Sequence, residues 1–288
     1  MSRAFGLGFT TFLPIPEFLP GAQATDVKVV RGLARAPVGG VPGGSLMATS
    51  ECIWLRWKGI GDYLVARDRV EIAVEPHVDD DMVRNLIVGP AVGALMHLRG
   101  YLVLHAACVA RGDTAVAFLG DSQWGKSTVG AACYLYGFRF VADDTTAIAP
   151  GGSRVTPAYP RTKLWPESAE ALGIDVAGLP TVHASIEKRS VRVDRGFTEK
   201  PATLARIYVL DEGDDPRVEP LDATEAFLEL VRHSYAADLL EMTGTRASHF
   251  AQVTELVRAV PVRRLRTGAP LERVREIPAL VAADLAAG

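Results

Sequence analysis

The segment from Thr114 to Asp144 constrains the fold more than any other part of the chain. An apolar run, TAVAFLG, leads directly into the loop GDSQWGKST, and the residues after the loop, TVGAACYLYG, have the spacing of a helix that ends at Gly137. The next run, FRFVADDTTAIAP, is predicted to form a strand. Strand, glycine-containing loop, helix and strand in this order predict an α/β fold in which the loop follows a buried strand.

The loop Gly120–Thr128 has the Gly-x4-Gly-Lys-Ser spacing of a loop that holds phosphate groups. In such loops successive backbone N–H groups point inward, and the following helix presents its positive N-terminus. Lys126 is predicted to reach the β- and γ-phosphates, and the Ser127 hydroxyl to bind Mg²⁺. The alternative is a turn that matches this pattern by chance, but such a turn would need neither a strand before it nor a helix after it. The context therefore favours a nucleotide site made of Gly120, Asp121, Ser122, Gln123, Trp124, Gly125, Lys126, Ser127 and Thr128.

Two adjacent carboxylates, Asp143 and Asp144, end the strand that follows the loop helix. Burying both carboxylates costs free energy unless a cation compensates them. One can hold a divalent metal while the other accepts a proton from an attacking hydroxyl. The alternative is a solvent-exposed strand end that caps the next turn, and the phosphate loop upstream favours the functional interpretation.

His105 interrupts the apolar run LVLHAACV, which precedes the loop strand. A single histidine in an apolar strand is often a hydrogen-bonded core residue. Neighbouring strands can also bring it next to the carboxylate pair, where it would orient or tune a carboxylate. The spacing leaves both interpretations open.

The run LHAACVARGDTAVAFLGDSQWGKST, followed by FVADD, resembles the catalytic domain of the HPr kinase/phosphorylase family over about residues 102–148. The resemblance implies the P-loop fold that this family shares with phosphoenolpyruvate carboxykinases, with ATP and Mg²⁺ as cofactors. It implies that Asp143 is the proton acceptor and that His105 lies beside it. It further implies that Asp144 and Ser127 are the Mg²⁺ ligands and that Lys126 clamps the phosphates.

Beyond residue 148, PAYPRTKLWPESAEALG, the pair Lys188-Arg189 and ARIYVL are similar to smaller HPr-kinase-related proteins encoded near ribosomal-peptide gene clusters. Some of those, associated with lasso peptides, phosphorylate a C-terminal serine of the precursor peptide. The chain departs from the bifunctional family in two places. WPESAEALG replaces a glycine-rich signature that carries a glutamate, with Glu167 or Glu170 as loose substitutes, and no PGRN-type segment follows.

These departures argue against phosphorylase activity and against HPr as the substrate. The sequence favours a kinase that works in one direction on a serine or other hydroxyl of a peptide or small protein. A small-molecule hydroxyl kinase and a nucleotide-binding regulator without phosphate transfer remain the alternatives.

The whole chain is predicted to contain a β-rich N-terminal domain (1–78), a helical joint (79–100) and a P-loop HPr kinase-like catalytic domain (101–288). In the first part, short β-branched and aromatic runs alternate with turns, and three prolines in LPIPEFLPG exclude regular structure there. In the joint, the carboxylates at 79–81 are placed to cap a helix in which Pro90 starts a second helix or makes a kink. The N-terminal domain is expected to serve acceptor recognition, oligomer contact or scaffolding.

Several further side chains have two interpretations. A basic stretch is expected to form a solvent-exposed face or, alternatively, to neutralise transferred phosphate or hold an acceptor carboxylate; it comprises Arg161, Lys163, Lys188, Arg189 and Arg192. The tripeptide at 232–234 is expected to be helix surface or packing. Trp124 is expected to line the acceptor side of the loop or to pack against the basic stretch.

The net charge of −3, from 31 Lys+Arg and 34 Asp+Glu, provides no general attraction to nucleic acid or an anionic membrane. The apolar segment LIVGPAVGALMHL is too short to span a bilayer and is predicted to be a buried helix. No export signal is evident, and the three cysteines form no C-x-x-C pair, so free thiols in a reducing compartment are expected. We therefore expect a cytoplasmic protein, with a homo-oligomer possible.

Overall fold

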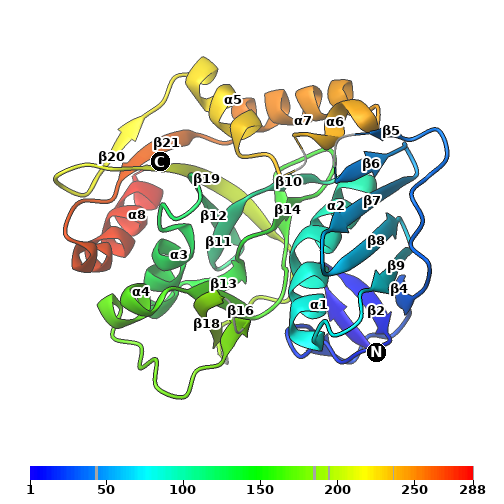
Figure 1. The fold of residues 1–288 in the computed structure, drawn as a ribbon. Helices are drawn as coiled ribbons and strands as arrows, with labels where there is room; N and C mark the ends of the chain where they lie inside the picture. The colour runs from blue at the N-terminus through cyan, green and yellow to red at the C-terminus, as the bar shows by residue number, and fades with distance from the viewer. Residues whose placement is uncertain (43–44, 184–185, 194, 236, 288) are drawn as a thin grey trace.

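The computed structural model describes residues 1–42, 45–183, 186–193, 195–235 and 237–287 as a mixed α/β structure with several sheets (Figure 1). The N-terminal strands, blue to cyan, lie to one side of a helical segment. A second large sheet lies on its other side. The α/β class predicted from the loop segment is confirmed.

The first sheet contains the N-terminal strands in the order β3-β1-β2-β4-β9-β8-β7-β6-β5. Both of its edge strands contain a proline, and one of them, β3, lies in the segment LPIPEFLPG, where the sequence predicted no regular structure. An edge strand has one unpaired side, so a residue without an N–H is tolerated there. The strands are β1 (Ser2–Ala4), β2 (Leu7–Thr11), β3 (Leu19–Pro20), β4 (Val27–Arg31), β5 (Val41–Pro42), β6 (Leu46–Ala48), β7 (Cys52–Trp57), β8 (Gly61–Ala66) and β9 (Arg69–Val74).

The helical segment is one continuous run of α1 (Asp80–Leu86), η1 (Ile87–Ala91) and α2 (Val92–Leu98). Asp79 caps it by accepting a 2.8 Å hydrogen bond from the backbone N–H of Met82, as the acidic triplet predicted. Pro90 does not start a second helix. It lies in η1, a π-helical turn, whose wider spacing accommodates a residue that has no N–H to donate.

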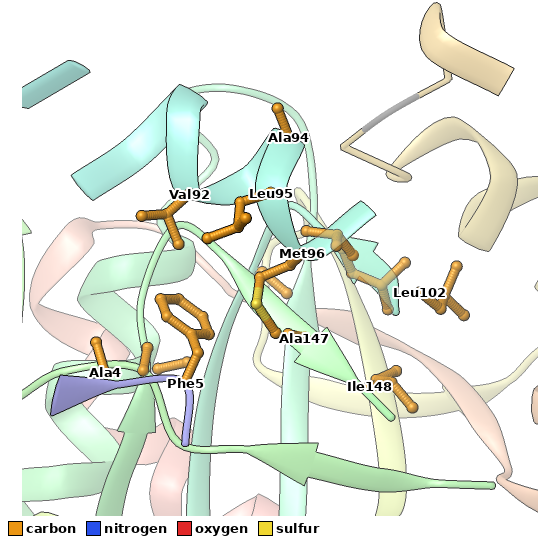
Figure 2. Close-up of a cluster of buried hydrophobic side chains, with 14 of the residues drawn as sticks. Ala4, Phe5, Val92, Ala94, Leu95, Met96, Leu102, Ala147 and Ile148 are labelled. Carbon is orange, nitrogen blue, oxygen red and sulfur yellow. The ribbon is translucent and has the colours of Figure 1, made fainter. Parts of the chain in front are cut away.

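Every residue of α2 is buried, which confirms the buried helix predicted for this apolar segment. Within the described ranges, no helix has both the length and the apolar character needed to cross a bilayer. Figure 2 shows that side chains of α2 such as Met96 pack together with Phe5 from the N-terminal segment and Ile148 from the second sheet. One hydrophobic cluster therefore joins both large sheets, and a separate 1–78 domain stays a prediction.

The second sheet differs from the prediction in a way that shapes the site. The sequence predicted single strands over 101–110 and 138–150, but each is broken in two, at His105 and at 143–145. Because β10 pairs with β14 and β11 pairs with β13, the two breaks face each other. The strands are β10 (Leu102–Leu104), β11 (Ala106–Arg111), β12 (Thr114–Leu119), β13 (Arg139–Ala142), β14 (Thr146–Ile148), β15 (Arg154–Thr156), β19 (Ala202–Asp211), β20 (Arg217–Pro220) and β21 (Val262–Arg266).

Three neighbouring strands of this sheet, β12, β19 and β21, run parallel. Helices α3 and α8 cover one face of the sheet, and α5 and α7 lie along the top in Figure 1. A small sheet, β16 (Arg161–Leu164), β18 (Ile186–Arg192) and β17 (Thr181–His183), lies below. The remaining helices are α3 (Lys126–Leu135), α4 (Pro166–Ala171), α5 (Ala223–Arg232), α6 (Leu239–Met242), α7 (Arg246–Ala259), η2 (Leu271–Glu276) and α8 (Ile277–Ala286).

Cysteine packing agrees with the thiol prediction. Cys108 in β11 and Cys133 in α3 are buried free thiols, and Cys52 in β7 is half-buried and also free. Burial raises the pKa of both buried thiols above its ordinary value, so they remain protonated at neutral pH.

Acid is expected to destabilise the fold through His97 in α2. Burial, with a smaller contribution from His249, lowers the pKa of His97 to about 4, from an ordinary value of 6.5. The neutral ring therefore contributes stability that is fully present above pH ~6.5 and is lost as the pH falls toward 4. The free energy of unfolding, measured with urea, should fall between pH 7.5 and pH 4.5, and this fall should be about 2–3 kcal/mol smaller for His97→Gln than for the wild type. Replacement of the exposed His77 by glutamine is the control and should show the same fall as the wild type. An equal fall in His97→Gln and in the wild type would contradict the assignment.

Candidate functional site

The loop between β12 and α3 has the backbone geometry of a phosphate site. Gln123 and Gly125 have left-handed backbones, with φ of +71° and +82°. Alternating backbone handedness of this kind turns successive N–H groups to one side. Gly125 precedes α3 and supplies no side-chain cap, so the N–H groups of the first turn, at Lys126, Ser127 and Thr128, have no intrahelical acceptor. Together with the helix dipole they favour an anion at this point.

Lys126 is held across the loop. Its Nζ donates hydrogen bonds of 2.8 Å to the carbonyl oxygens of Gly120 and Asp121, and the residue is only 7% exposed. Burial lowers the pKa of Lys126, and the nearby carboxylates of Asp144 and Asp143 offset part of that effect. The ammonium group is therefore already inside the loop, where phosphate oxygens would replace the carbonyls as partners.

Asp143 joins the loop to the small sheet. Its carboxylate accepts a 2.8 Å hydrogen bond from the Ser127 hydroxyl, a 2.7 Å bond from Thr162 Oγ1 and a 3.1 Å bond from the Lys163 backbone N–H. Asp143 is 5% exposed, and these three donors compensate its burial. The sequence singled out the aspartate and the serine, whereas no local signal points to Thr162.

His105 contacts Asp144 rather than Asp143, which corrects the placement implied by the resemblance. His105 Nδ1 lies 3.0 Å from the Asp144 carbonyl oxygen and 3.1 Å from its carboxylate Oδ1. Both are acceptors, so Nδ1 carries a hydrogen. The reason lies in the strand break, where Asp144 adopts a left-handed backbone with φ +70°, a strained conformation typical of functional sites.

The Asp144 carboxylate is kept ionised. Burial raises its pKa, but the hydrogen bond from His105 and the positive charges of Lys163 and Lys188 outweigh burial and hold the pKa well below its usual range. Lys163 Nζ lies 4.0 Å from Asp144 Oδ2 and donates a 2.9 Å hydrogen bond to Asn85 in α1. Asp144 is thus a negatively charged, partly exposed group next to the loop.

Arg232 and His233 belong to the site, although the sequence predicted only helix surface or packing for them. Helix α5 ends at Arg232, whose guanidinium forms an ion pair with the Asp121 carboxylate of the loop. The next residue, His233, accepts a 2.9 Å hydrogen bond from the His105 backbone N–H. The end of α5 therefore ties the loop to the strand break, a link between residues more than a hundred positions apart.

The basic stretch is divided between the site and the surface. Lys163 and Lys188 line the pocket over the phosphate loop, and Arg161 donates a 2.9 Å hydrogen bond to Ser190 across β16 and β18. Lys188 Nζ lies 5.4 Å from the ring centre of Trp165, a cation–π contact. Arg192 is exposed. Of the two suggested glutamates, Glu167 lines the same pocket and Glu170 is exposed outside it.

Two pockets meet at Asp144 and Lys163. The loop pocket is lined by His105 and by residues of the loop other than Trp124, namely Ser122, Gln123, Gly125, Lys126, Ser127 and Thr128. The α1 pocket is narrower, with a volume of about 100 Å³, and is lined by Asp143, Asp144, Lys163, Glu17, Arg84, Asn85, Tyr159 and Arg161. Three buried polar atoms of the α1 pocket have no hydrogen-bond partner: Glu17 Oε2, Arg84 Nε and Arg161 Nε. The two pockets approach the Asp144 carboxylate from different sides.

Trp124 is 38% exposed and lines a third hollow, the Trp124 pocket, with residues 211–214 and 267–271. No residue of the basic stretch lines this pocket. This pocket shares no lining residue with the α1 pocket. The aromatic partner of the basic stretch is Trp165 instead.

The oxygen atoms of Ser127, Asp143 and Asp144 suit a hard cation such as Mg²⁺. Among the residues that the structure describes, no group of three or more His, Cys, Asp or Glu side chains is arranged to hold a metal. Magnesium at nucleotide sites is usually held by one or two carboxylates and by the substrate phosphates. The donor set therefore fits magnesium that arrives with a nucleotide.

Comparison with protein-family models gives no match, and comparison with curated proteins gives none either. Among solved structures, the HPr(Ser) kinase/phosphatase from Coxiella burnetii matches with 10% sequence identity and a TM-score of 0.32. The match covers 64% of this chain and 97% of that one. It falls on the family that the sequence resembles, but a TM-score this low does not establish a shared fold, so the family and the activity rest on the site itself.

Proposed function

We propose that the protein is an ATP- and Mg²⁺-dependent kinase of the HPr kinase/phosphoenolpyruvate carboxykinase type, which transfers the γ-phosphate to a hydroxyl group. One observation carries this proposal: the Ser127 hydroxyl of the phosphate loop lies 2.8 Å from the Asp143 carboxylate, with Asp144 the next residue. A loop serine beside an acidic strand end is the arrangement with which P-loop enzymes hold a magnesium–nucleotide complex.

The contacts favour a division of roles opposite to the one implied by the resemblance. Asp143 accepts three hydrogen bonds, one of them from the Ser127 hydroxyl of the loop, so we assign Asp143 and Ser127 to the cation. Asp144 lines both pockets and is oriented by His105, so we assign it as the proton acceptor. Bound magnesium would neutralise charge on the β- and γ-phosphate oxygens.

In the reaction we propose, the acceptor oxygen attacks the γ-phosphorus in line. The bond from phosphorus to the bridging oxygen breaks, the phosphoester bond forms, and ADP leaves. The hydroxyl proton passes to Asp144, whose orientation His105 maintains. Lys126 and the loop N–H groups stabilise the transferred charge, and Lys163 and Lys188 add positive charge from the other side of the loop pocket.

The α1 pocket is the proposed entrance for the acceptor. Asp144 lies in its wall, none of the loop residues 120–128 line it, and Glu17 brings the N-terminal part of the chain into its wall. Arg84 is ion-paired with Glu17 and Asp81, whereas the buried Nε–H group of Arg161 has no hydrogen-bond partner and suits an acceptor with an anionic group near its hydroxyl. A serine at the C-terminus of a ribosomal, lasso-type precursor peptide has this chemistry, and we propose such a cytoplasmic peptide or small protein as the acceptor.

A small-molecule hydroxyl kinase is the second candidate, because the α1 pocket is narrow enough to enclose a single hydroxy acid. The test is incubation with ATP, Mg²⁺ and one of three acceptors, with mass spectrometry as the readout. The acceptors are peptides encoded beside the gene, the same peptides with an amidated C-terminus, and free serine. We expect one added phosphate on a free-carboxylate peptide, much less on the amidated form, and none with Lys126→Ala. Phosphate on free serine alone would favour the second candidate, and ATP binding without any transfer would favour a nucleotide-binding regulator.

A further inference from the structure

The Trp124 pocket lies where parallel sheets bind ligands. The neighbouring parallel strands β12, β19 and β21 end at Leu119, Asp211 and Arg266. The segments that follow them are the phosphate loop, residues 211–214 and residues 267–271, and these three segments form the pocket wall. Ligands of such sheets bind outside the carboxyl ends of the strands, where the loops of neighbouring strands converge.

The Trp124 pocket continues the loop pocket. Both are lined by Gln123, Gly125, Thr128 and Leu271, so space passes from one to the other along the start of α3. The α1 pocket meets the loop pocket at Asp144 and Lys163 and shares nothing with the Trp124 pocket. A molecule whose phosphates occupy the loop, and whose terminal phosphate faces Asp144, therefore has its remaining part directed toward Trp124.

The lining of the pocket suits a nucleoside. Its volume of about 670 Å³ is within the range of small-molecule sites. Trp124 and Leu271 are exposed apolar side chains at its wall, with Val129 and Val274 beside them. An exposed indole ring is a stacking platform for a flat heterocycle. The exposed carboxylates of Glu212 and Asp214 add acceptors for sugar hydroxyl or exocyclic amino groups.

We infer that the Trp124 pocket is the binding site for the nucleobase and ribose of the donor nucleotide, with the base stacked on Trp124. This inference rests on the proposed kinase function, because it takes the phosphate loop to hold the donor's phosphates. It assigns Trp124 to the donor and not to the acceptor.

The test compares two ligands that share their phosphates. Calorimetry with Mg²⁺ would measure the affinity of the whole protein for ATP and for inorganic tripolyphosphate. We expect the wild type to bind ATP more tightly than tripolyphosphate. Trp124→Ala should weaken ATP binding about tenfold, as expected for loss of one stacked base, and leave tripolyphosphate binding unchanged. Trp124→Phe should retain most of the ATP affinity because it keeps an aromatic face.

Tyr136, which is 56% exposed at the far end of α3, provides a matched control, since Tyr136→Ala should change neither affinity. Equal weakening of both ligands by Trp124→Ala would show that the tryptophan only shapes the loop, and would overturn the inference. A wild type that binds ATP no better than tripolyphosphate would also overturn it while leaving the phosphate site intact. Binding of neither ligand would overturn the proposed function and this inference together.

Discussion

Replacing Lys126 with alanine is expected to reduce the rate of phosphate transfer about a thousandfold, with little change in thermal stability. The Lys126 ammonium is the cation that lies inside the loop, hydrogen-bonded to the Gly120 and Asp121 carbonyl oxygens. In the transition state negative charge shifts toward the oxygen that leaves with ADP, so loss of this cation affects the rate more than the binding of the ground state. Initial rates of ADP release at saturating acceptor, with a thermal unfolding curve for each variant, would measure both effects.

Lys58 offers a control for this prediction, because it is exposed in the turn between β7 and β8. Lys58→Ala removes the same charge and should retain the wild-type rate. If Lys126→Ala kept its rate within about threefold of that control, the loop would not be a site of phosphate transfer, whatever it binds.

Replacing Asp144 with asparagine is expected to lower the transfer rate by about 10²–10⁴-fold while magnesium–ATP still binds. An amide cannot accept the hydroxyl proton. Asparagine also tolerates the left-handed backbone at this position, so the substitution tests chemistry and not folding. The measurement is the single-turnover rate, together with the affinity for ATP.

Asp143→Asn is the matched comparison. It keeps the shape of the side chain but weakens the pair with Ser127, so we expect a higher magnesium concentration to be needed for half-maximal rate. If Asp143→Asn instead abolished transfer at saturating magnesium, and Asp144→Asn mainly raised the magnesium requirement, the division of roles would be the one implied by the resemblance.

Features that depend on a few adjacent residues could be predicted from the sequence. The loop, the strand before it and the helix after it follow from an apolar run, two glycines and a helical spacing within thirty or so residues. The helix cap at Asp79 is equally local, since the capping oxygen and the N–H that it accepts are three residues apart. The acidic pair was identified by its place after a strand.

Features that depend on strand register could not be predicted in this way. The breaks at His105 and at 143–145 face each other only because β10 and β11 pair with β14 and β13, and that pairing selects Asp144 as the partner of His105. Composition and spacing along one strand do not specify which residue of another strand lies opposite, and a change of one position in register exchanges the two faces.

The sequence by itself determined that a loop with the spacing of a phosphate site, a loop lysine and two carboxylates lie between a strand, a helix and a second strand, because local backbone preferences and residue chemistry suffice for each. Only the tertiary structure decided which other residues contact the loop and the two carboxylates. Thr162 and Ser127 bind Asp143, Arg232 binds Asp121, and Trp124 lies toward the ends of β19 and β21. Each of these contacts joins segments brought together by strand pairing and core packing, and no local pattern carries that information.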